Sequence, residues 1–398
     1  MMGINYPGIN IMRLVLQVIG NQWSVIGNIG TLSTISGAGT TFIAGNTQGT
    51  VTIRCELLTM SSLATIEVVL KGPVYIKGGE VSGRWTKGGS PYVIIDNIYI
   101  PKGKTLKIDA GVVVKFHYYI ARWNDPFLDW IIPPEIIRRN LTVHGSLIAE
   151  GTEQEPIIFT PISDGGTNTL AEGGTGIPYF GDWDKLIFEP GSIGRLKHCQ
   201  IKYAGYADWW YYDIIKIEPA VLIKSKDVEM SNCIVTNKGG CARRSSKQQG
   251  RGILIEGVIG NDHEMVSNTE VSGCWGGIVI KNCRGIQVNN NTVKENGGYG
   301  IEVVNSQQIK LLTNTVSSCS DAAFSQDLAF SEIEYRGNKA ENNKFDLIWL
   351  SGEPQKDKET ILKKVELPYG FNSLTIPVGA TLRIEPGAKF TLTRLGGD

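Results

Sequence analysis

The chain has 398 residues with 39 Lys plus Arg and 39 Asp plus Glu, so its formal net charge is zero, which argues against a dedicated nucleic-acid-binding protein. Hydrophobic residues make up 41% of the chain, too many for a disordered protein, and no uncharged apolar run approaches the roughly 18 residues of a membrane span. The length predicts two or three domains, and the four His argue against a multi-histidine metal enzyme.

The N-terminus carries no secretory signal. Residues 1–20 lack a basic segment followed by a clean apolar core and a small-residue cleavage site. The chain is therefore cytosolic, or its export signal is not part of this sequence. The seven Cys are spread over the chain without a CxxC pair, which argues against a compact disulfide framework and against a zinc ribbon.

Residues 1–72 predict a small β-sandwich, because alternating apolar segments recur between Gly-rich turns. Strands are expected at 14–18, 51–53 and 65–70. The run Gly-Thr-Thr-Phe-Ile-Ala-Gly-Asn-Thr-Gln-Gly-Thr-Val-Thr-Ile at 39–53 resembles bacterial Ig-like domains of the invasin type. The resemblance implies an Ig-like module that lacks an early strand at its N-terminus.

A repeat of 23 residues runs through the second half of the chain. Asn268, Asn291 and Asn314, each followed by Thr, are 23 residues apart, and Asn338 follows after 24. A short apolar strand recurs in each unit, as at 278–280. This period fits one coil of a right-handed parallel β-helix, with coils stacked ~4.8 Å apart. An inward Asn at a fixed turn would form a hydrogen-bonded ladder from coil to coil.

Earlier coils carry insertions. Cys199 and Cys233 occupy the repeat position that Thr269 holds later, at intervals of 34 and 36 residues. The two Cys would stack on neighbouring coils, either as a disulfide or, as we expect, as buried free thiols. Loops that project from one region of a β-helix are the first places to look for ligand binding. The predicted insertions are 117–140, 207–213 and 241–251.

A second repeat brackets the β-helix. Residues 100–111 recur as 376–387 in the pattern IPxGxTLxI(D/E)xG, which reads as short strands between Pro and Gly turns. With the coil-like segment 141–149 and Gly181-Asp182-Trp183, this pattern resembles extracellular right-handed β-helix proteins of the pectate-lyase-like type. The resemblance implies an all-β fold of about ten coils. That fold carries lyases, hydrolases, adhesins and inert stalks alike.

These patterns divide the chain into three parts. The predicted parts are an Ig-like β-sandwich at 1–72, a β-helix at 73–352 and a C-terminal repeat of the entry coil at 353–398.

The strongest functional signal is a run of four aromatic residues. They cannot all face a β-helix core, because alternate strand residues point outward. Flat rings stack on sugar faces, and the flanking carboxylates can hydrogen-bond to hydroxyls. The alternative is a loop packed on the flank of the helix or on another subunit. The predicted carbohydrate-binding residues are Asp208, Trp209, Trp210, Tyr211, Tyr212 and Asp213.

No catalytic residue is assigned. The NTD, DD and GHG motifs of pectin-degrading glycosidases are absent. Asp182 and Asp184 lie two residues apart on an apparent strand, so one of them is a candidate Ca²⁺ ligand or base, and the alternative is an exposed strand with polar ends. A lyase would use Asp208 and Asp213 with Lys216 as the base.

Two other polar features have simpler interpretations. The basic residues of 241–251 either contact an anionic polysaccharide or form solvated surface. His263 stands in an Ile position of the repeat and is expected in the core.

The leading hypothesis is a non-enzymatic extracellular or cell-surface protein, namely a stalk, an adhesin or a filament subunit that also binds carbohydrate. Open strand edges pair readily, which favours self-assembly. The alternative is a polysaccharide lyase or glycoside hydrolase. No metal site is assigned and no cofactor is expected, although the acidic residues leave Ca²⁺ open. The expected partners are polysaccharide or other copies of the chain, with no nucleic acid and no membrane span.

Overall fold

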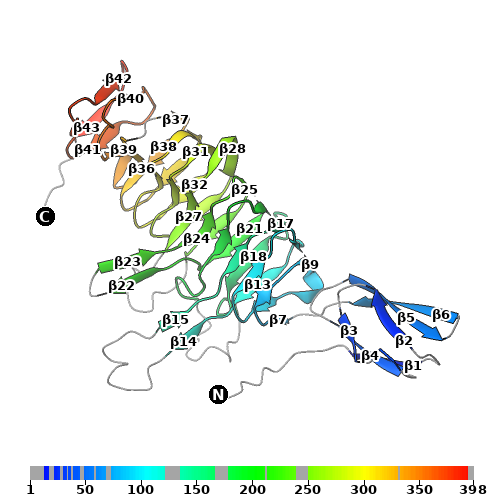
Figure 1. Ribbon diagram of the computed structural model, residues 1–398. Coiled ribbons are helices and arrows are strands. Elements are labelled where there is room, and N and C mark those ends of the chain that lie inside the picture. The colour runs from blue at the N-terminus through cyan, green and yellow to red at the C-terminus, as the bar shows by residue number, and fades with distance from the viewer. Residues whose placement is uncertain are drawn as a thin grey trace.

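The structure is a computed structural model, and nearly all its described residues lie in strands or in the turns between them (Figure 1). Its one helical element in those residues is a 3-10 turn, Lys87–Gly89. The described residues are 13–17, 22–26, 30–33, 35–36, 39–44, 49–57, 60–68, 73–121, 135–165, 178–210, 213–238, 250–329 and 332–392.

The N-terminal strands form two antiparallel sheets of three strands each, in the orders β1-β4-β3 and β2-β5-β6. Trp23, Phe42 and Ile53 are buried. Strands therefore occur near the three predicted positions, whereas the Ig-like assignment stays a prediction. The strands are β1 (Arg13–Gln17), β2 (Gln22–Ile26), β3 (Gly30–Leu32), β4 (Gly39–Ala44), β5 (Gly49–Leu57) and β6 (Met60–Val68).

From β7 onward, three long parallel sheets run side by side. Sheet I has ten strands: β7 (Val74–Ile76), β10 (Tyr92–Ile94), β13 (Val113–Phe116), β18 (Ile157–Pro161), β21 (Cys199–Lys202), β26 (Ile234–Thr236), β29 (Glu270–Ser272), β32 (Thr292–Lys294), β35 (Thr315–Ser317) and β38 (Lys339–Glu341).

Sheet II has twelve strands: β8 (Gly79–Glu80), β11 (Ile98–Ile100), β16 (Leu141–Val143), β19 (Leu186–Phe188), β24 (Pro219–Ile223), β27 (Arg251–Glu256), β30 (Ile278–Lys281), β33 (Ile301–Val304), β36 (Ala322–Asp327), β39 (Phe345–Ser351), β41 (Tyr369–Phe371) and β43 (Phe390–Leu392).

Sheet III has nine strands: β9 (Gly83–Trp85), β12 (Thr105–Ile108), β17 (Ser146–Glu150), β20 (Ile193–Lys197), β25 (Asp227–Ser231), β28 (Ile259–Ser267), β31 (Arg284–Asn289), β34 (Gln307–Leu312) and β37 (Ile333–Arg336).

The chain visits sheets I, II and III in turn, and each strand pairs in parallel with the strands one coil before and one coil after it. Strands alternate between inward apolar and outward residues, so that Ile278 stacks on Ile301 in one inward column and Ile280 stacks on Val303 in the next. Inward residues from all three sheets form one continuous core, which includes the stacked rings of Phe116 and Trp183. The predicted parallel β-helix is confirmed.

A buried asparagine ladder lies at the turn between sheets III and I. Asn291 Nδ2 donates to Asn314 Oδ1 at 3.0 Å, and Asn314 Nδ2 donates to Asn338 Oδ1 at 3.1 Å. The prediction that Asn268 belongs to the ladder is wrong by one residue. Thr269 occupies this ladder position instead, and its backbone N–H donates to Asn291 Oδ1. The cause is an irregularity in β28, which shifts the register before this turn.

Cys233 and Cys199 continue this column as buried free thiols. The backbone N–H of Cys233 donates to Thr269 Oγ1, and that of Cys199 donates to Cys233 Sγ at 3.4 Å.

The last coils differ from the others. After β39 the chain forms β40 (Glu359–Leu362), which does not continue sheet III but pairs in parallel with β42 (Thr381–Ile384). β41, between these two strands in the chain, and β43, after β42, extend sheet II.

All the long insertions occur at the turn from sheet I to sheet II. Two of them form antiparallel hairpins, β14 (Tyr119–Ala121) with β15 (Glu135–Ile137) and β22 (Ala207–Trp210) with β23 (Asp213–Ile217). Both hairpins project from the same flank of the helix (Figure 1). The insertions between the flanking strands of sheets I and II are 117–140, 162–185, 203–218 and 237–250.

Candidate functional site

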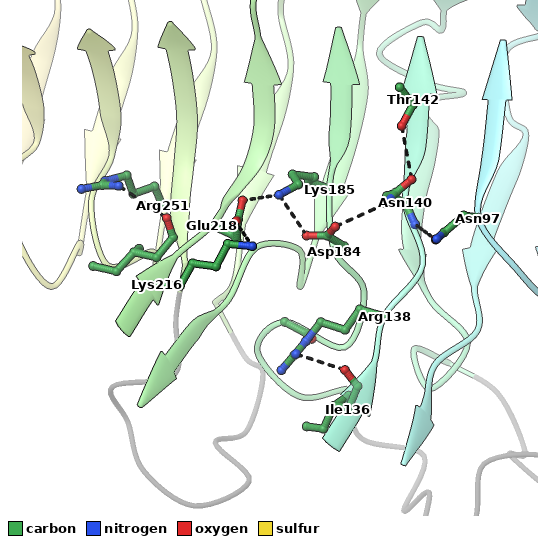
Figure 2. Close-up of polar contacts among 12 residues, drawn as sticks. Asn97, Ile136, Arg138, Asn140, Thr142, Asp184, Lys185, Lys216, Glu218 and Arg251 are labelled. Carbon is green, nitrogen blue, oxygen red and sulfur yellow. Dashed lines mark hydrogen bonds and ion pairs between the residues drawn. The ribbon is translucent and has the colours of Figure 1, made fainter. Parts of the chain in front are cut away.

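A row of polar side chains lies where the strands of sheet II begin, at the base of the insertions (Figure 2). Asn97 and Asn140 precede neighbouring strands, and the backbone N–H of Asn140 donates to Asn97 Oδ1 at 3.0 Å. Asn140 Nδ2 donates to Asp184 Oδ2 at 3.4 Å, and Thr142 Oγ1 donates to Asn140 Oδ1 at 3.3 Å. The parallel stacking of the coils thus turns residues far apart in sequence into one row.

The row continues as a chain of ion pairs. Lys185 Nζ lies 3.4 Å from Asp184 Oδ1 and also contacts Glu218, whose other carboxylate oxygen pairs with Lys216. The side chains of Asp184, Lys185 and Glu218 are largely buried, and Figure 2 shows Lys185 pointing between the two carboxylates.

The pKa values of the two carboxylates are shifted in opposite directions. Burial raises the pKa of Asp184, and the charge of Glu218 raises it further, against the opposing effects of Lys185 and Asn140. Burial also acts to raise the pKa of Glu218, but hydrogen bonds from Lys185 and Lys216 outweigh it, so this pKa lies below its ordinary value. Asp184 Oδ1 is buried and accepts no hydrogen bond from any described group.

Two arginines fix the hairpins at their bases. Arg138 donates to the backbone oxygens of Gly181 and Ile136, and its guanidinium carbon lies 3.9 Å from the ring centroid of Tyr206. Arg251 donates to the backbone oxygen of Ile217 at 3.4 Å. These contacts tie each insertion to its neighbour along the helix.

The outer face of sheet II exposes an aromatic ring in its first coils. Tyr99 is 42% exposed between two inward Ile residues, and His144 packs edge-on against it with a centroid separation of 6.5 Å. A hollow lies at the far ends of these strands, lined by Tyr99, Pro101, Lys102, His144, Pro190 and Gly191. Further along, the outward residues Leu222, Leu254 and Val279 are buried in a second apolar cluster. Ile187 of β19 also packs against this cluster. The open face over β11 and β16 is therefore bounded by the polar row at one end and by the hollow at the other.

The predicted aromatic loop is part of the hairpin β22–β23. In the backbone register, Trp209 is opposite Ile214 and Trp210 is opposite Asp213, with an irregularity between Asp208 and Trp209. Tyr211 and Tyr212 lie outside the described residues, as do residues 122–134 and 241–249 of the other predicted insertions. The carbohydrate-binding assignment of the six residues 208–213 stays a prediction.

The structure corrects the pairing of Asp182 with Asp184. They lie in the turn before β19, not on an exposed strand, and the fully buried Trp183 separates them. Asp182 is itself buried and accepts hydrogen bonds from Ser163 Oγ and from the backbone N–H of Tyr179. Asp182 is therefore a structural residue, and only Asp184 reaches the polar row.

Sequence reasoning missed Tyr99, Lys185 and Glu218. For Tyr99 a signal was present, since an aromatic residue between Ile98 and Ile100 in a strand must face outward. Lys185 and Glu218 meet because they directly precede β19 and β24, which pair in neighbouring coils, and the inserted hairpin makes their separation in sequence differ from the 23-residue repeat. Lys216, considered as a base, is instead paired with Glu218.

Within the described ranges, no group of three or more His, Cys, Asp or Glu is arranged to hold a metal ion. The same part of the chain contains no helix long and apolar enough to cross a membrane.

The family model described as right handed beta helix region matches residues 189–356. The strands from β7 onward therefore form a right-handed parallel β-helix. No curated protein matches the sequence.

Two solved structures illustrate the likeness. A mutant of the periplasmic alginate epimerase AlgG aligns over 79% of this chain and 85% of its own, with 11% identity and a TM-score of 0.37. Tailspike protein 2 from the Escherichia coli O157:H7 bacteriophage CAB120 aligns over 95% of this chain and 53% of its own, with 12% identity and a TM-score of 0.37. Likenesses at this level carry no information about activity.

Proposed function

We propose that this β-helix is an extracellular or cell-surface protein that binds polysaccharide without cleaving it. The observation that carries the proposal is the open face of sheet II over β11 and β16. An exposed ring, Tyr99, lies on this face next to hydrogen-bonding side chains that repeat from coil to coil. A rigid row of this kind matches a polymer, whose hydroxyls also repeat along a line.

The charges at the site support binding over cleavage. Glu218 is held by two lysines, and Asp184 is held by Asn140 and Lys185. Neither carboxylate is free to act on a substrate without first breaking these contacts. The projecting hairpins, with Trp209 and Trp210 in β22, would form the wall of the binding surface.

A second candidate, a polysaccharide lyase or glycoside hydrolase, is favoured by one observation. The pKa of Asp184 is raised and that of Glu218 is lowered, and such a split is how paired carboxylates become an acid and a base. In this alternative Asp184 would carry the proton and Glu218 would remain ionised.

One experiment separates the two candidates. Wild type, Tyr99→Ala and a control, Ile259→Ala, are applied to an array of neutral and acidic polysaccharides with Ca²⁺ present. We expect wild type and Ile259→Ala to bind and Tyr99→Ala to lose binding. Ile259 is an exposed residue of β28 on sheet III, away from the site.

The same samples are followed for product. Unsaturated sugars absorbing in the ultraviolet would indicate a lyase, and new reducing ends would indicate a hydrolase. Either product, if abolished by Asp184→Asn, would replace the binding proposal with the enzymatic one.

A further inference from the structure

Sheet III is interrupted between β37 and β40. β37 pairs with β34 and β40 pairs with β42, but β37 and β40 do not pair with each other. Nearly all the Cα–Cα separations between β37 and β40 exceed 8 Å, whereas paired strands lie ~4.8 Å apart. Sheet II continues without a break beside this point, through β39, β41 and β43. Two strand edges therefore face each other across a space inside the β-helix.

The strand register shows which main-chain groups of β37 face this space. In a parallel sheet, successive residues direct their N–H and C=O groups to opposite neighbouring strands. The backbone oxygen of Glu332 accepts from the N–H of Ile309 at 3.0 Å, so the even-numbered residues of β37 face β34. The residues of β37 that face β40 are therefore Ile333 and Tyr335.

The same reasoning applies to β40. The backbone oxygen of Lys358 accepts from the N–H of Thr381 at 3.2 Å, so the even-numbered residues face β42 and the odd-numbered ones face β37. Within the part of the chain that the structure describes, the N–H and C=O groups of four residues on these two edges form no hydrogen bond, namely Ile333, Tyr335, Glu359 and Ile361. Unpaired strand edges of this kind readily accept a further strand.

A groove of about 910 Å³ lies over the interruption, on the outward side of sheet III. Its lining includes residues at or next to both bordering strands, namely Glu332, Glu334, Glu359, Ile361 and Lys363. Among these side chains, three carboxylates outnumber one ammonium group. The groove therefore favours basic over acidic side chains in a segment that lies there.

The ion pairs of the groove leave these carboxylates accessible. Glu334 lies 3.9 Å from Arg336 and Glu359 lies 3.0 Å from Arg383. All four side chains are exposed, and exposed pairs contribute little, so an ammonium group of a ligand can replace the arginine.

We propose that the interruption is a docking site for an extended segment of a partner protein, which pairs as a strand between β37 and β40. Its main chain would supply hydrogen-bond partners to both open edges, as in recognition by strand addition. Basic side chains on its outward face would lie beside Glu332, Glu334 and Glu359. Its inward side chains would meet the buried Tyr335 and Leu362, which favours apolar residues there. The site lies on sheet III and does not rest on the polysaccharide-binding face of sheet II.

Amide hydrogen exchange of the full chain without a ligand is the first test. The N–H groups of Ile333 and Ile361 face the space, whereas those of Glu334 and Leu362 belong to the ladders with β34 and β42. We expect fast exchange for the first two and slow exchange for the last two. Slow exchange of all four would show that the chain itself fills the space, and would overturn the proposal.

Titration with a peptide of alternating Lys and Val, about six residues long like an ordinary strand, is the second test. Binding should slow exchange at Ile333 and Ile361. The same peptide with alternate amide nitrogens methylated cannot donate to one of the two edges and should not bind. A peptide of alternating Glu and Val should bind at least ~10-fold more weakly. No binding of the Lys–Val peptide at ~1 mM, or equal binding of all three peptides, would overturn the proposal.

A pair of variants locates the peptide. Ile361→Pro removes an N–H that faces the space and leaves the bonds from β40 to β42 in place, so it should weaken binding at least ~10-fold. Ile361→Ala keeps that N–H and is the matched control, with affinity close to that of wild type. Equal affinities for the Pro and Ala variants, with both folded by thermal unfolding, would show that the peptide binds elsewhere.

Discussion

Lys185 and Glu218 form an ion pair that joins two neighbouring coils of sheet II at the base of the insertions. Both side chains are largely buried, and Lys216 approaches the same carboxylate from the hairpin strand β23. The pair therefore fixes the position of the projecting hairpin relative to the strands below it.

Glu218→Gln should destabilise the protein in a pH-dependent way. The pKa of Glu218 is lowered below its ordinary 4.5, so its ionised form stabilises the folded state above that pH, and this stabilisation is lost as the pH falls through the folded pKa. We expect a loss on the order of 1–3 kcal/mol at pH 7 that shrinks below pH 4.5, measured by urea unfolding. Glu256→Gln, which breaks a more exposed pair with Lys281, is the control and should cost less than about 1 kcal/mol. A pH-independent loss for Glu218→Gln would contradict this account.

Asp184→Asn should behave in the opposite way. Its pKa is raised above the ordinary 3.8, so ionisation of Asp184 costs folding free energy once the pH rises through the folded pKa. The substitution removes that cost, and we expect the variant to be as stable as wild type or more stable at pH 7, with the gain disappearing as the pH falls toward 3.8. The account is wrong if the same urea titrations show a destabilised variant at pH 7 that recovers in acid.

Asn314→Ala should cost on the order of 3 kcal/mol of unfolding free energy, because several buried groups lose partners at ~1–3 kcal/mol each. Asn314 accepts from the backbone and side chain of Asn291 and donates to Asn338 and to the backbone oxygen of Val288. Thr292→Ala, at an exposed position of β32, is the control. Equal urea midpoints for the two variants would show that the ladder contributes nothing.

The repeat predicts the fold because a β-helix stacks like residues on like. The 23-residue period placed Ile278 over Ile301 and Asn291 over Asn314, and both stacks are present. The prediction is wrong in β28, where register irregularities hold His263 half-exposed opposite the buried Ile286. Asn268 keeps the 23-residue spacing to Asn291, so the spacing alone does not reveal that the bulge has shifted the register by one residue.

The site was less predictable than the fold. The insertions could be located from the unequal repeat intervals, and the structure brings them to one turn. Glu218 and Lys185 directly precede paired strands, but the hairpin in this coil places them 33 residues apart, a separation that the 23-residue repeat does not predict. Contacts of this kind depend on the lengths of the insertions and on which side chains become buried. Neither is visible as a fixed spacing in a single sequence.

The double substitution Trp209→Ala, Trp210→Ala tests the predicted aromatic wall. It should weaken polysaccharide binding about tenfold, which corresponds to about 1.4 kcal/mol, and should leave the unfolding midpoint within the error of wild type. Binding is measured by titration with the polysaccharide that scores highest on the array. If affinity is unchanged while the midpoint falls, these residues pack on the β-helix and do not contact sugar.

The most direct test of the proposed function is a calorimetric titration of that polysaccharide into wild type, Tyr99→Phe and Tyr99→Ala. Tyr99 is outward and partly exposed, so neither substitution should alter the fold. We predict that Tyr99→Phe keeps most of the affinity and that Tyr99→Ala loses at least about tenfold, since the ring face supplies the contact. Equal affinities for all three proteins would contradict the assignment of this face of sheet II as the binding surface.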